Sequence, residues 1–70
     1  MHGIVHIRGH ELIAVKVRDT RYKARTAAIE MAVALGIGEM KAKAQFDRFG
    51  FCDIENDEAV ERIYVRELTP

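Results

Sequence analysis

The chain has 70 residues, of which 49% are apolar and 31% are charged, and its formal net charge is zero. This composition is typical of a folded globular domain and argues against a disordered tail. The single cysteine, Cys52, excludes an intrachain disulfide and, with no signal-peptide pattern, favours a reducing, cytoplasmic location. The longest apolar run has five residues, whereas a spanning helix needs about 20, so we expect no membrane partner.

The length predicts one small domain over residues 1–70. A chain of this size buries only about 60% of its unfolded surface, so its stability margin is narrow. Small domains often gain stability from disulfides, metals or association. With an intrachain disulfide excluded, we expect a homo-oligomer such as a homodimer.

Residues 1–18 predict a β-hairpin, because apolar residues alternate with polar ones in two short runs. The alternating apolar residues all have odd numbers: Val5, Ile7, Ile13, Val15 and Val17. A three-residue loop, Gly9-His10-Glu11, pairs Ile7 with Ile13 and Val5 with Val15 on the core face. A two-residue Gly9-His10 turn would mix the two faces, so we favour the longer loop.

A helix follows, with Asp19 or Thr20 as its N-cap and Gly36 just beyond its last turn. Its apolar side consists of Tyr22, Ala28, Ile29, Ala32 and Leu35. A second interpretation extends the sheet through residues 22–24 and begins a shorter helix after Thr26, which is a good cap. We favour the longer helix.

A second helix is predicted over residues 39–49, ending at Gly50, with Ala42, Phe46 and Phe49 as its buried stripe. The remaining sequence indicates strand, turn and strand. The turn lies at residues 56–57 and the last strand covers residues 62–68. Because Val60 and Ile63 do not alternate, either a bulge or a helical turn is expected between them.

These elements predict an α+β domain that has an N-terminal β-hairpin, two helices and a C-terminal strand or hairpin. An antiparallel sheet would carry both helices on one face.

The zero net charge conceals an asymmetry along the chain. Residues 1–50 carry nine basic and five acidic residues, and residues 51–70 carry two basic and six acidic residues. The segment 16–25 alone holds Lys16, Arg18, Arg21, Lys23 and Arg25, with Asp19 as its one acid. Cations at a helix N-terminus oppose the helix dipole, so this cluster suggests an acidic partner. That partner is nucleic acid, another protein, or the acidic turn near residues 53–61 of this chain or of a second copy.

No motif indicates a catalytic, metal or cofactor site. On a strand, His2 and His6 would lie about 13 Å apart, which is too far to share one ion, and we expect the histidines to face solvent. Cys52 has no neighbouring base in the sequence and is expected to be a buried or half-buried structural residue. The chain contains no serine. We therefore expect a non-catalytic protein without a cofactor.

Residues 31–50 resemble a helix-turn-helix motif, with Ala32 in the first helix and Leu35-Gly36-Ile37 at the corner. The second helix would then present Lys41, Gln45 and Arg48 as one stripe suited to phosphates and base edges. The resemblance implies DNA binding, with the C-terminal hairpin in the place of a wing.

Two functions follow as expectations. The first is a protein-interaction module, either an inhibitor or a regulatory accessory protein. In size and composition the chain is similar to the small accessory proteins of phages and mobile elements, including anti-CRISPR proteins. The alternative is a helix-turn-helix or winged-helix-like nucleic-acid-binding regulator. The candidate binding surface is the same set of residues in both cases: Lys16, Arg18, Arg21, Lys23, Arg25, Lys41, Gln45 and Arg48.

Overall fold

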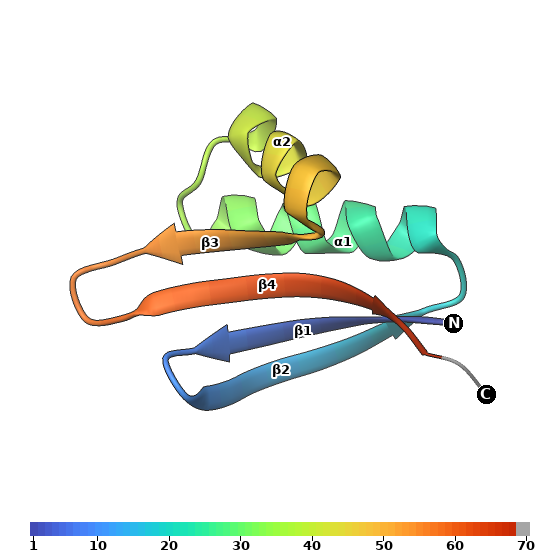
Figure 1. Ribbon diagram of the computed structural model, residues 1–70, viewed down its shortest axis with the longest axis horizontal. Helices are drawn as coiled ribbons and strands as arrows, with labels where there is room; N and C mark the ends of the chain where they lie inside the picture. The colour runs from blue at the N-terminus through green and yellow to red at the C-terminus, as the bar shows by residue number, and fades with distance from the viewer. Residues whose placement is uncertain (69–70) are drawn as a thin grey trace.

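A computed structural model describes residues 1–68 of the chain. It contains one four-stranded antiparallel sheet and two helices that lie on the same face of this sheet (Figure 1). The elements in chain order are β1 (His2–Arg8), β2 (Glu11–Arg18), α1 (Arg21–Ala34), α2 (Glu39–Phe49), β3 (Phe51–Glu55) and β4 (Val60–Glu67). The strand order is β2-β1-β4-β3, so the first and last strands pair at the centre. The predicted α+β class and antiparallel sheet are confirmed.

The turn of the first hairpin differs from the prediction. Arg8 pairs with Glu11, so the connection is the two-residue Gly9-His10 turn and the predicted three-residue loop is wrong. Gly9 has a φ of 59°, in the left-handed region that tight hairpin turns require and glycine adopts readily.

A β-bulge in β2 resolves the spacing that had suggested the longer loop. Ile7 pairs with Leu12 rather than with Ile13, which is left as the extra residue of the bulge. The predicted pairing of Val5 with Val15 is confirmed. The bulge therefore keeps these apolar side chains on one face while allowing a tight turn.

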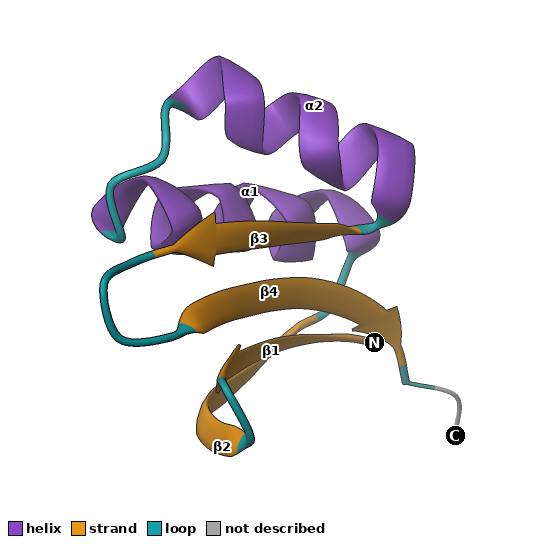
Figure 2. Cartoon of the chain, turned by 60° about the vertical axis from the view of Figure 1, so that its left-hand side comes forward, coloured by secondary structure: helices purple, strands orange, loops and turns teal. Residues whose placement is uncertain are grey.

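The sheet faces the helices with the opposite side from the one predicted. Ile4 and His6, at even positions of β1, are buried against the helices, whereas Val5 and Ile7 point away from them. Val15, which we placed in the core, is 55% exposed. Alternation separates the two faces of a strand but does not say which face the helices cover. Figure 2 shows both helices on one side of the sheet and none on the other.

Helix α1 follows the longer of the two interpretations. Thr20 is its N-cap, and the Thr20 side chain accepts a hydrogen bond from the Lys23 backbone N–H at 3.1 Å. Gly36, with a φ of 106°, follows the C-cap as predicted. The buried residues are Ala24, Ala28, Ile29 and Ala32. Tyr22 was wrongly assigned to the apolar side and is 75% exposed, because Ala24 is the residue of the first turn that faces the core, and Tyr22 lies beside Arg18 instead.

Helix α2 begins and ends where the sequence predicts. Gly50, with a φ of 78°, ends the helix and donates its N–H to the Phe46 carbonyl. Ala42 and Phe46 are buried, but Phe49 is 54% exposed and does not belong to the buried stripe. The chain reverses after Phe49, whose ring instead stacks on Phe51 with centroids 5.5 Å apart.

The C-terminal strands form a regular hairpin. The Asn56 side-chain oxygen accepts hydrogen bonds from the N–H groups of Glu58 and Ala59, which confirms the predicted turn. Strand β4 begins at Val60, earlier than predicted, and pairs without a break with both neighbours. Val60 and Ile63 lie on opposite faces, so neither the bulge nor the helical turn is needed.

The core between the sheet and the helices is thin. Its largest fully buried side chains are Ile4, Ile63 and Cys52, and four of the six buried helical residues are alanines, beside Ile29 and Phe46. Small side chains let the helices approach the sheet closely but bury little apolar area. Within residues 1–68, neither helix is long and apolar enough to cross a membrane.

Candidate functional site

The cations of segment 16–25 are partly neutralised within the chain. Lys23 lies 3.3 Å from Asp19, and Arg25 contacts Asp47 of α2 at 2.9 Å. The acidic groups that these two cations meet are therefore inside the same chain, and neither belongs to the acidic turn.

Lys16 and Arg18 lie on the helix side of the sheet. In the register of the hairpin, Lys16 pairs with Ile4 and Arg18 pairs with His2, and directly opposed residues share a face. The sequence pattern, with Val15 and Val17 on the core face, predicts that Lys16 and Arg18 project from the outer face of the sheet. This prediction is wrong, for the same reason as the faces of Val5 and Val15.

The predicted stripe on α2, Lys41, Gln45 and Arg48, lies partly against β3. The Gln45 side-chain oxygen accepts a hydrogen bond from the Asp53 backbone N–H at 3.1 Å, which fixes this side chain to the sheet. Lys41 lines the same hollow as Gln45 and Glu55. The Arg48 guanidinium lies 5.3 Å from the centre of the Phe49 ring. Gln45 thus already contacts the protein, and the hollow beside Lys41 also holds acidic side chains.

Cys52 and His6 are both buried on the core side of the sheet. Cys52 is fully buried as predicted, and burial together with the nearby Asp53 charge raises the pKa of its thiol. His6 is buried, so the expectation that all three histidines face solvent was wrong for this residue. Among residues 1–68, no group of three metal-ligating side chains has a geometry that could hold an ion.

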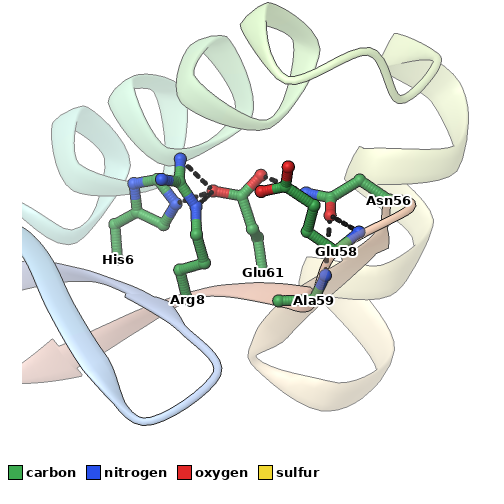
Figure 3. A network of polar contacts seen from close by, with 6 residues as sticks. All are labelled: His6, Arg8, Asn56, Glu58, Ala59 and Glu61. Atoms are coloured by element: carbon green, nitrogen blue, oxygen red, sulfur yellow. Dashed lines mark hydrogen bonds and ion pairs between the residues drawn. The ribbon is translucent and has the colours of Figure 1, made fainter.

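A buried carboxylate, Glu61 of β4, was missed from the sequence. It is only 4% exposed and lies on the helix side of the sheet (Figure 3). One of its oxygens accepts hydrogen bonds from His6 Nε2 and Arg8 Nε, both at 2.9 Å. The other accepts from Asn56 Nδ2 at 2.9 Å. The only sequence signal was that His6 and Arg8 fall on one face of a strand, which would place two donors beside the same partner.

The environment of Glu61 indicates a structural role. Burial acts to raise the pKa of Glu61, but the hydrogen bonds from His6 and Arg8 outweigh it and hold this pKa below its usual value. Both oxygens already accept hydrogen bonds from side chains of the protein. The carboxylate therefore fastens β4 to β1 and to the turn at Asn56.

The surface with the clearest capacity to bind is the uncovered side of the sheet, which we call the open face. Its central row crosses all four strands through Val15, Val5, Tyr64 and Phe51, which pair in this order. The other apolar members, by register or contact, are Leu12, Val17, Ile7, Val60, Phe49 and Leu68. Contiguous exposed apolar surface of this kind marks an interaction site in natural proteins.

The two halves of the open face differ in chemistry. The half formed by β1 and β2 is aliphatic, whereas the half formed by β3 and β4 carries aromatic rings and arginines. The Arg62 guanidinium lies 4.1 Å from the Phe51 ring centre and forms a bidentate pair with Asp53 at 2.7 and 2.9 Å. The hydrogen bond from Arg62 lowers the pKa of Asp53, so this pair stays ionised and locally neutral.

Comparisons with protein-family models, with curated proteins and with solved structures found no match to this chain.

Proposed function

We propose that the protein is a small non-catalytic interaction module, regulatory or inhibitory in type, that docks onto another protein surface through its open face. The observation that carries this proposal is the apolar row across all four strands, with Val15 55% exposed at one end. Burying such side chains stabilises a complex by about 25 cal/mol per Å² of apolar area, before the costs of association.

The chemistry of the open face favours a protein over a nucleic acid as the partner. Aliphatic side chains at Leu12, Val15 and Val17 offer no donor to phosphates and no ring for base stacking. On the aromatic half, Arg62 already covers Phe51 and is paired with Asp53. A net charge of zero also gives little nonspecific attraction to a polyanion.

The test is site-specific photo-crosslinking in cells that express the protein. A photoreactive side chain at Val15 should capture a protein, whereas the same side chain at Val33 should not. Val33 is a matched control, because it is an exposed valine on α1, away from the open face. Equal capture from both positions would contradict the proposal.

The nucleic-acid alternative is tested separately by gel shift at about 50 mM salt, where phosphate contacts are strongest. No shift is expected with duplex DNA, single-stranded DNA or RNA. A shift abolished by Lys41→Glu with Arg48→Glu would favour the helix-turn-helix function instead.

A further inference from the structure

We propose that the open face binds a second copy of the chain, so that two sheets pack face to face around a twofold axis that crosses the strands at the level of Ile63, one residue from the central row. This inference rests on the proposed function and names the partner. Under this symmetry the strands of the two copies run in reversed directions. The aliphatic half covers the aliphatic half, and the aromatic half covers the aromatic half.

The charges on the open face fit this reversed arrangement. Arg62 is paired with Asp53, which leaves Glu55 and Arg66 with no ion-pair partner among residues 1–68. Glu55 pairs with Val60, at one end of the β3–β4 half, and Arg66 lies six residues further along β4. At about 3.3 Å per residue, the opposite charges are some 20 Å apart along the strand direction.

Reversing the strands brings Arg66 of each copy to the end that carries Glu55 of the other. The pattern is therefore complementary to itself, with two identical ion pairs at the two ends of an apolar strip. A twofold axis along the strands would instead keep the strand directions and lay the aliphatic half of each copy over the aromatic half of the other, so that Arg66 would meet the level of Gly3 and no acidic side chain. Complementary charges of this kind set the register of an interface more than its affinity.

The size of the open face predicts the strength of the association. Four strands about 4.8 Å apart and seven residues long give a flat footprint of roughly 400 Å² per copy. Both copies together give about 800 Å², which is below the about 1,200 Å² of stable specific interfaces and in the range of weak, transient complexes. We therefore expect a dimer that forms at micromolar concentrations and dissociates on dilution.

The thin core gives an independent reason for a partner on this side. A 70-residue chain whose largest fully buried side chains are Ile4, Ile63 and Cys52 gains little stability from its own interior. A second copy would cover Val15, Val5 and the neighbouring apolar side chains and add the missing burial without lengthening the chain.

The charge pattern permits a test by sedimentation equilibrium between about 10 and 500 µM, the range that an interface of this size predicts. The wild type should show a reversible monomer–dimer equilibrium. Glu55→Arg and Arg66→Glu should each weaken association at least about tenfold, because like charges then meet at both ends. An equimolar mixture of these two variants should dimerise again, because each copy then carries the charges complementary to the other.

Two further variants keep the result interpretable. Glu58→Arg changes the charge equally but lies in the turn, so it should leave the dimer unchanged. Val15→Lys should abolish association while circular dichroism shows a folded chain, because the side chain is exposed on an edge strand.

A wild type that stays monomeric at 500 µM, or a mixture that associates no better than its separate components, would overturn the second copy as the partner. If the photoreactive side chain at Val15 still captures a different protein, the interaction module survives and only self-association fails. If both experiments fail, the open face is not a docking surface and both proposals fall.

Discussion

The two faces of the sheet differ in role: one packs against the helices, and the other is uncovered. The covered face is closed by small helical side chains and by one buried polar cluster around Glu61, and it holds the fold together. The open face has no helix over it, yet it presents an unbroken apolar row across every strand. When one face of an antiparallel sheet always faces solvent, the side chains on that face are usually polar. Apolar side chains on the open face therefore indicate a surface that is covered in a complex.

The comparison predicts that equal truncations on the two faces have unequal effects on folding. Ile4→Ala removes a fully buried side chain and should lower the free energy of unfolding by about 2–5 kcal/mol. The total expected for a domain of this length is only some 4–10 kcal/mol, so this variant should be largely unstable. Val15→Ala should cost less than about 1 kcal/mol in the monomer. Urea denaturation at low protein concentration measures both, and similar losses at the two sites would contradict this difference in role between the faces.

The polar cluster on the covered face should have the next largest effect. Glu61→Gln keeps the shape of the side chain but leaves buried donors with a weaker acceptor, so we expect a loss of about 1–3 kcal/mol. Glu58→Gln, in the turn that precedes β4 and exposed, is the matched control and should change stability by less than about 0.5 kcal/mol. Equal stability of the two variants would show that the cluster does not fasten the covered face.

The same cluster predicts a dependence of stability on pH. The folded-state pKa of Glu61 lies below its usual value of 4.5, because it is held down by His6 and Arg8. Its contribution is therefore present above this value and is lost as the pH falls through the lowered pKa. Denaturant midpoints between about pH 6 and 3 should fall more steeply for the wild type than for Glu61→Gln. Parallel pH profiles would contradict this assignment.

The smallest expected effect concerns the exposed ion pair between the helices. Asp47→Asn removes the partner of Arg25 and should lower stability by no more than about 1 kcal/mol, as for surface ion pairs in general. Asp57→Asn, in the turn, is the control without such a contact. A loss above 2 kcal/mol for Asp47→Asn would show that the helical layer depends on this pair far more than we infer.

Local sequence signals predicted the elements well. Thr20, Gly36 and Gly50 mark helix ends by cap and turn chemistry that acts within a few residues, and both helices follow these signals. Asn56 fixed the last turn in the same way. Local capping allows either a helix that starts after Thr20 or a shorter one that starts after Thr26. The longer helix was preferred, and the structure confirms this preference.

The faces could not be predicted because they depend on contacts between distant segments. The apolar residues Val5, Val15 and Val17 suggested a core face, but helix α1 packs on Ile4 instead. The prediction of the loop length relied on Ile13 and was wrong, because a bulge shifts the alternation of a strand by one residue and leaves no clear mark in the sequence. Glu61 was counted only within the acidic turn near residues 53–61, since its partners His6 and Arg8 lie 55 and 53 residues away in the chain.

The contrast between the two faces is tested most directly by methyl NMR spectra of the protein recorded at about 10 and 500 µM, which spans the weak association expected for this interface. The methyl signals of Val5 and Val15 should shift with concentration, while those of Ala28 in the covered core and of Val33 on α1 should stay in place. Concentration-independent spectra, or shifts that centre on Val33 and the helices, would contradict the assignment of the open face as the docking surface for a second copy.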